Sequence, residues 1–169
     1  MNWLVATAVS LALLPWYTTE GTWWGASALL HGFQGRPWLL VLFLPLIAVF
    51  RRTSGSFMLA GAAGVLLMLL QGFLFRHPNI TPEGWPTQPG MGYGALAAGT
   101  GFLMMFCQGL AARGFCRGDA FVVGAIGLVV ATIAVFVFFP IFVMLASAFE
   151  GGSFLASFFD RSIWGIDCL

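Results

Sequence analysis

Five apolar segments alternate with short polar turns along the chain. A helix needs roughly 20 apolar residues to cross a bilayer, and the third and fourth segments reach that length without extension. The pattern predicts an all-α membrane protein with about five transmembrane helices, forming a single helical region over 1–169. We expect these spans near residues 3–18, 35–50, 56–75, 92–112 and 120–141. Pro45 and Pro140 lie inside the second and fifth spans, where we expect kinks.

The longer connections differ in character. Residues 19–34 carry several aromatic side chains among Gly and Thr, which is typical of a stretch lying at the membrane surface. Residues 76–91 hold four of the eight prolines, which favours an irregular exposed loop. Residues 150–169 are rich in aromatic residues, and we expect an interfacial tail there.

Arginine position predicts the orientation. Arg51 and Arg52 close the second span, and Arg113 and Arg117 lie in the turn after the fourth. Short cytoplasmic turns carry an excess of basic residues. We therefore expect both turns and the N-terminus inside, with loops 19–34 and 76–91 and the C-terminal tail outside.

The composition excludes several function classes. Charged residues make up 8% of the chain, against roughly 25% in soluble domains. So few charges cannot cover the surface of a soluble domain. A soluble enzyme, a nucleic-acid-binding protein and a disordered linker are therefore excluded.

The predicted spans lack the side chains of membrane chemistry. The Asp, Glu, Arg and His residues fall in loops or at span ends, where we expect Arg36 to extend to the interface, and the chain has no Lys. Proton relays and ion-coupled carriers need intramembrane ionisable groups, and haem needs axial ligands. We expect no catalytic residue, cofactor or metal site, and no enzymatic activity. His31 and His77 are expected in solvent, while Cys107, Cys116 and Cys168 fall at different places on this topology.

Small residues recur at four-residue spacing, which lets helix backbones approach closely. Gln71 and Gln108 lie at opposite depths, so we interpret each as an interhelical hydrogen-bonding residue. The candidate packing pairs are Ala60 and Gly64, Ala97 and Gly101, and Gly127 and Ala131; Ala95 and Gly99 repeat the spacing.

Two stretches carry a family resemblance. They are Leu13-Leu14-Pro15-Trp16-Tyr17 and the segment 158–169, Phe-Phe-Asp-Arg-Ser-Ile-Trp-Gly-Ile-Asp-Cys-Leu. Together they resemble the N-terminal portion of large permeases of binding-protein-dependent ABC importers of the ferric-iron type. The resemblance implies a bacterial inner-membrane protein. In that family the chain continues past a stretch like 164–169 into the further spans of a permease core.

The family's coupling loop has no counterpart here. Permeases of this type contact their ATPase through a cytoplasmic Glu-Ala-Ala loop, and turns 51–55 and 113–119 are too short to form one. We therefore expect a fragment or split N-terminal part that cannot couple ATP hydrolysis by itself. Its implied partners are the lipid bilayer and a permease core, through which it meets the ATPase subunit and the periplasmic binding protein.

Two other readings remain open. A stand-alone structural or assembly subunit of a membrane complex accounts for the same packing residues. A membrane enzyme or redox subunit would need haem, quinone or catalytic residues inside the spans, and the sequence offers none there.

Overall fold

The computed structural model describes residues 2–18, 25–49, 53–74, 90–141 and 144, which fold as helices with no strand among them. Two compact units divide the chain, residues 1–128 and residues 129–169. The helices are α1 (Asn2–Leu13), α2 (Ala28–Phe33), the 3₁₀ helix η1 (Pro37–Phe43), α3 (Leu44–Ala48), α4 (Ser54–Leu74), α5 (Tyr93–Ala111), the 3₁₀ turn η3 (Phe115–Gly118), α6 (Ala120–Ile133) and the π-helical η4 (Ala134–Phe138).

Among the described residues, three helical stretches are long and apolar enough to cross a membrane. They are Ser54–Gly72, Tyr93–Ala111 and Ala120–Ile141. Two further stretches, Asn2–Leu13 and Pro37–Ile47, are apolar but shorter. The all-helical class is therefore confirmed with three candidate spans, while a count of five remains a prediction.

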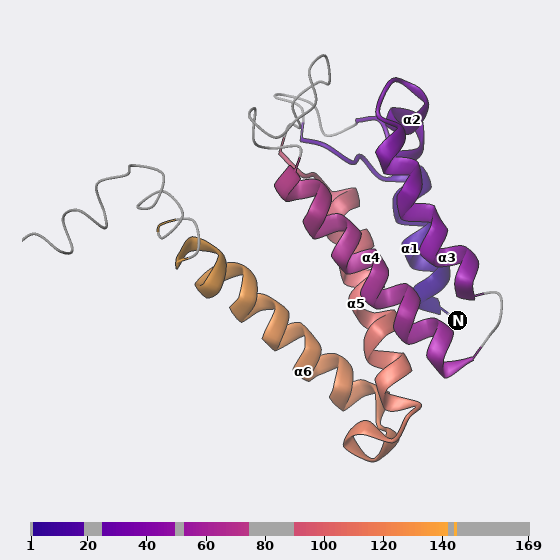
Figure 1. The fold of residues 1–169 in the computed structure, drawn as a ribbon, viewed down its shortest axis with the longest axis vertical. Helices are drawn as coiled ribbons and strands as arrows, with labels where there is room; N and C mark the ends of the chain where they lie inside the picture. Colours follow the sequence, from indigo (N-terminus) through magenta and orange to yellow (C-terminus); the bar gives the residue numbers. More distant parts are fainter. Residues whose placement is uncertain (1, 19–24, 50–52, 75–89, 142–143, 145–169) are drawn as a thin grey trace, which may run out of the picture. The chain divides into compact units, whose positions relative to one another are not determined.

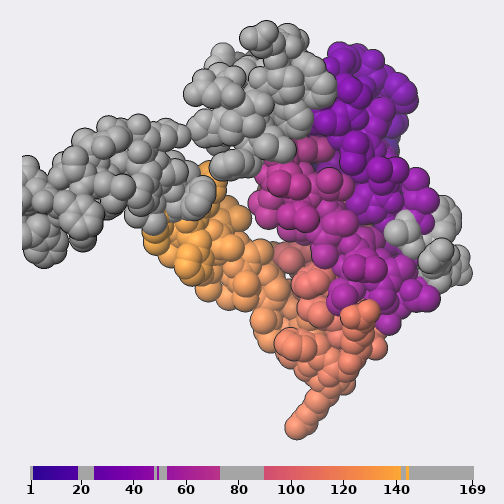
Figure 2. All heavy atoms as spheres, in the orientation of Figure 1, coloured from indigo at the N-terminus to yellow at the C-terminus, as the bar shows by residue number. Residues whose placement is uncertain are grey.

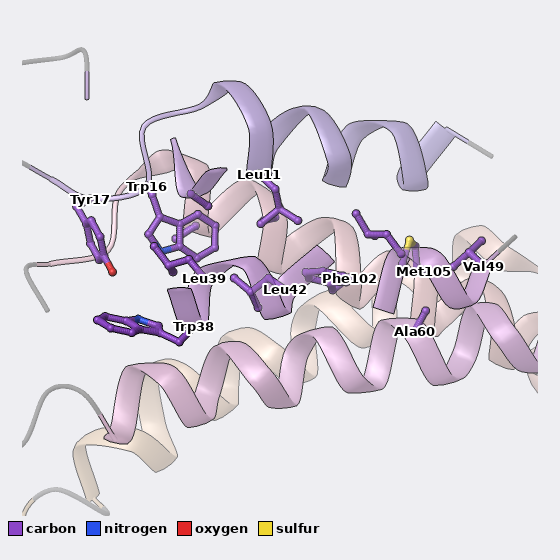
Figure 3. Packing of buried hydrophobic residues seen from close by; sticks show 14 residues of the cluster. Leu11, Trp16, Tyr17, Trp38, Leu39, Leu42, Val49, Ala60, Phe102 and Met105 are labelled. Carbon is purple, nitrogen blue, oxygen red and sulfur yellow. The ribbon is translucent and has the colours of Figure 1, made fainter. Parts of the chain in front are cut away.

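In the first unit, α4 and α1 both pack against α5, and η1 and α3 pack against α4 (Figure 1). Figure 2 shows the side chains of α4 meeting those of the segment 37–48 over the visible face. The shared core runs lengthwise between these helices (Figure 3). Its largest fully buried side chains include Leu11, Trp16, Leu39, Leu42, Phe102 and Met105.

The helix α1 ends at Leu13, five residues before the predicted end of the first span. Pro15 explains the early end, because it lacks a backbone N–H and disfavours helical geometry at the residue before it. After Leu14 the chain is extended rather than helical through the rest of the described stretch, up to residue 18.

The prolines at 45 and 140 each lie at a change of helix type. The backbone N–H of Leu44 donates to the carbonyl of Val41, three residues back, and Pro45 has no N–H to continue that ladder. The π-helical turn η4 ends two residues before Pro140. A proline ring clashes with the carbonyl four residues earlier, here that of Phe136, and a wider turn relieves the clash.

Candidate functional site

The closest helix packing lies between α4 and α5, at three glycines. A Cβ atom added at Gly61 would lie 2.7 Å from the Cα of Phe106, and one at Gly109 would lie 2.7 Å from the Cα of Met58. A Cβ atom at Gly64 would overlap the ring of Phe102. The neighbours at Gly61 and Gly109 are backbone atoms, which cannot rotate away. Only glycine therefore permits this contact between α4 and α5.

The helix α1 meets α5 at Gly101. A Cβ atom there would lie 3.1 Å from the Cβ of Thr7, which is fully buried. The hydroxyl of Thr7 donates to the carbonyl of Trp3 at 2.7 Å, and that of Ser10 donates to Ala6 at 2.7 Å. Both hydroxyls are thus satisfied within α1, so they can face α5 without an unpaired polar atom.

The helix α6 begins with a side-chain cap and two glycines. Asp119 Oδ1 accepts from the N–H groups of Phe121 and Val122 at 2.9 and 3.2 Å. A Cβ atom at Gly124 would lie 3.2 Å from the sulfur of Met104, and one at Gly127 would overlap the sulfur of Cys107. The first turns of α6 therefore pack closely on α5.

The extended segment 15–18 is hydrogen-bonded on both sides. The N–H of Trp16 donates to Ala26 at 3.0 Å, and the carbonyl of Trp16 accepts from Gly92 at 2.8 Å. Thr18 and Gly90 pair at 2.9 Å, as do Gly94 and Pro15. This segment ties the end of α1 to the starts of α2 and α5. Such internal pairing is what non-helical backbone requires at membrane depth.

An aromatic cluster lies at the same end of the first unit, comprising Trp16, Tyr17, His31, Arg36 and Trp38. The rings of Tyr17 and His31 meet edge to face at 5.0 Å, and the Arg36 guanidinium carbon lies 4.6 Å from the centre of the Tyr17 ring. Figure 3 shows Tyr17 and Trp38 at one end of the core, with the Tyr17 hydroxyl directed toward Trp38.

The electrostatics of the aromatic cluster centre on His31. Burial lowers the pKa of His31 below its ordinary value, and the positive charge of Arg36 lowers it further. The imidazole is therefore neutral near pH 7. Arg36 supplies the positive charge of the aromatic cluster.

Gln71 links α4 to η1. Its side-chain amide donates to the backbone carbonyl of Trp38 at 2.8 Å, and both groups are buried. The interhelical hydrogen bond expected for Gln71 is therefore present. Bonds of this kind in membranes average about 0.6 kcal/mol.

The six candidate packing residues fall in different surroundings. Gly64 faces Phe102, Gly101 faces Thr7, and Gly127 faces Cys107, so they serve separate helix pairs. Ala60 is buried, whereas Ala97 and Ala131 are half-buried.

Of the four arginines predicted to determine the topology, Arg113 and Arg117 lie within the described residues. Arg51 and Arg52 lie outside the described residues. Arg113 Nη1 donates to the sulfur of Met58 at 3.4 Å, which places the end of α5 beside the start of α4. Arg117 is exposed in η3 and has a left-handed backbone, with φ of 59°.

Sequence reasoning missed the helix caps and two of the closest contacts. Ser27 caps α2, Asp119 caps α6, and Thr53 and Ser56 bond each other reciprocally at the start of α4. A Ser, Thr or Asp directly before an apolar helix is the signal that predicts such caps. Gly61 lies between Ala60 and Ala62, so spacing alone does not single it out. Gly109 has Met105 and Arg113 four residues away, so it is not part of the four-residue pattern.

In the part of the chain that the structure describes, His, Cys, Asp and Glu form no group of three that could hold a metal ion. Cys107 and Cys116 are free thiols. No family model, curated protein or solved structure matches this chain. The packing faces and the aromatic cluster are therefore the candidate functional features.

Proposed function

We propose that the chain is the accessory N-terminal membrane region of a binding-protein-dependent importer permease, of the type that imports ferric iron. It packs against a permease core in a bacterial inner membrane and is not itself an enzyme. It does not couple ATP hydrolysis by itself. The observation that carries the proposal is the glycine packing of α4 on α5, which builds a rigid helical scaffold from small residues.

The proposed topology has five spans, with the N-terminus inside and the C-terminus outside. Two contacts support an alternating arrangement in the first unit: Arg113 reaches the start of α4, and the segment 15–18 pairs with the start of α5 at the other end. The short stretches Asn2–Leu13 and Pro37–Ile47 complete the spans together with their flanking residues. The arginines at 51, 52, 113 and 117 support the inside placement of both turns.

An apolar groove supplies a surface for the core. It runs along α4 and α5 and is lined by Ala62, Val65, Leu66, Leu69, Leu103 and Phe106. A neighbouring transmembrane helix packs through van der Waals contact with such a surface. We propose that a helix of the permease core occupies it.

The sequence of the DNA beyond codon 169 tests the importer proposal. We expect it to encode, in frame or after a frameshift, further spans with a cytoplasmic Glu-Ala-Ala loop. A stop codon followed by unrelated genes would reject this proposal.

Reporter fusions test the topology separately. Fusions at Ser54 and Gly118 are expected to report cytoplasmic, and fusions at Gly84 and Leu169 periplasmic. A periplasmic signal at Gly118 contradicts the five-span arrangement, whatever the DNA encodes.

A stand-alone structural or assembly subunit is the second candidate function. The same apolar groove favours it, because any transmembrane helix can pack there. Cross-linking from a photoreactive residue at Leu69, followed by mass spectrometry of the captured protein, separates the two. A permease peptide supports the importer role, and a partner unrelated to transport ATPases supports the assembly role.

A further inference from the structure

Arg36 is held firmly at the junction of α2 and η1. Its backbone N–H donates to the carbonyl of His31 at 3.1 Å, and its carbonyl accepts from Leu39 at 3.1 Å. Its guanidinium lies over the ring of Tyr17, which is itself buried. Tyr17 forms an antiparallel backbone bridge with Met91. The cation is therefore preorganised, and binding a ligand costs less side-chain entropy than at a free surface arginine.

Within the described residues, the N–H donors of the Arg36 guanidinium remain available. A guanidinium carries five N–H donors at the edge of its plane, and contact with a ring uses its face. Within the described ranges no residue accepts a hydrogen bond from this side chain. His31 beside it is neutral near pH 7, because burial and Arg36 both lower its pKa. An anion approaching Arg36 therefore meets one positive charge and several oriented donors.

Apolar side chains are exposed at the same end of the first unit. Leu30 and Phe33 of α2 are 52% and 76% exposed, and Leu13 at the end of α1 is 72% exposed. An arginine beside exposed leucine and phenylalanine is typical of the boundary between lipid tails and headgroups. A free anion would make no use of these apolar side chains, whereas a lipid contacts both kinds of group.

We propose that Arg36, held over Tyr17, binds the phosphate of an anionic membrane phospholipid whose acyl chains cover Leu30 and Phe33. A planar guanidinium binds phosphate oxygens through two parallel hydrogen bonds. The site anchors the tied end of α1, α2 and α5 to the bilayer surface. It goes beyond the importer proposal and does not depend on it.

Lipid titration of the purified full chain in mild detergent tests the site. We expect phosphatidylglycerol to raise the unfolding temperature saturably and to stay bound to the wild type in native mass spectrometry. Arg36→Gln is expected to weaken the apparent affinity about tenfold. Arg36→Lys keeps the charge without the planar fork, and we expect a loss of about threefold. Arg117→Gln, at an exposed arginine in η3, is the matched control and is expected to titrate like the wild type.

Several outcomes overturn the proposal. The same lipid affinity in the wild type and in Arg36→Gln overturns it. Arg36→Lys, which keeps the positive charge, provides the test if Arg36→Gln does not fold, and wild-type affinity in that variant also overturns the proposal. Equal stabilisation by inorganic phosphate at the same concentration assigns a free-anion site instead. The unfolding temperatures without lipid give a further test. If Arg36→Gln lowers this temperature and either Glu20→Gln or Glu83→Gln lowers it by the same amount, the guanidinium pairs within the protein and not with lipid.

Discussion

The helix α5 and the continuous helical stretch Ala120–Ile141, which joins α6 and η4, are both of transmembrane length. The second is the more apolar of the two, yet it is the less buried. Tyr93–Ala111 has a mean hydropathy of 1.4 and half of it is buried, whereas Ala120–Ile141 reaches 2.8 and only 11% of it is buried. In a soluble protein the more apolar helix would be expected in the core. The reversed order fits a membrane protein, in which lipid tails solvate apolar side chains as well as other helices do.

Small residues explain the burial of α5. The buried residues of α5 include Gly94, Ala95, Ala98, Gly101 and Gly109. They admit neighbouring backbones and side chains, so α5 gains contacts that lipid cannot replace. Past Leu128, the stretch to Ile141 carries mainly β-branched and phenylalanine side chains, which suit contact with lipid. Between α5 and the stretch Ala120–Ile141, the difference in burial therefore does not follow hydropathy.

Matched Phe→Ala substitutions should give the largest difference between the two helices. Phe102 of α5 is fully buried and fills the space opposite Gly64. Phe102→Ala should cost about 3 kcal/mol in the free energy of unfolding, because it leaves a cavity. Phe138→Ala removes a ring that is 63% exposed, and we expect less than about 0.5 kcal/mol. Denaturation by SDS in mixed micelles measures both, and equal costs would break the comparison.

Gly→Ala substitutions test whether small size itself buries α5. Gly61→Ala on α4 forces a Cβ atom against the backbone of Phe106, and we expect a loss of about 2 kcal/mol. The control is Gly99→Ala on α5, where the added atom meets the flexible end of Met68 at 3.4 Å. That variant should be neutral or slightly stabilised, since alanine favours helix. A Gly61→Ala protein as stable as the control would mean that α4 and α5 can separate without cost.

The fold class could be predicted from the sequence, but the extent and type of helix in the first two apolar segments could not. Length and apolar content predict α4, α5 and α6, because continuous runs of that kind fold as helices in lipid. The end of α1 at Leu13 depends on Pro15, and the pairing of segment 15–18 depends on residues as far away as Gly92. Long-range backbone pairing leaves no periodic pattern in the sequence.

The use of small residues in helix packing could be predicted from the sequence, but the partner of each small residue could not. Four-residue spacing predicts that small residues pack helices, but a run such as Ala60-Gly61-Ala62-Ala63-Gly64 permits several registers. The partner chosen by each glycine depends on where Phe102 and Phe106 fall on α5. Similarly, Tyr17, His31 and Arg36 are far enough apart in sequence that only the tie between α1 and α2 brings them together.

Removal of the Asp119 cap should affect α6 and leave α5 intact. The carboxylate accepts from two N–H groups in the first turn of α6, and Asp119→Ala should cost about 1 kcal/mol. Asp119→Asn keeps an acceptor and serves as the control. Hydrogen exchange should rise at residues 121–124 of the alanine variant, with residues 94–98 unchanged. A comparable rise in both helices would show that they unfold as one unit.

Lowering the pH should reduce the local stability of the start of α5 and not that of α6. We expect this effect to be smaller than the effect of removing the Asp119 cap. Because the pKa of His31 is lowered in the folded protein, the unfolded chain binds its proton more readily, so stability falls as the pH drops through about 6.5 toward the lowered value. Protonation places a second cation beside Arg36 at the ring of Tyr17, whose backbone pairs with Met91 just before α5. The protection of residues 94–98 from hydrogen exchange, taken relative to the intrinsic exchange rate at each pH, should therefore fall between pH 7.5 and 5.5, while that of residues 122–126 of α6 stays constant. The matched variant His31→Gln has no proton to gain in this range, so the protection of residues 94–98 should be the same at both pH values. An acid-induced loss of protection that persists in His31→Gln would assign the pH effect to another group.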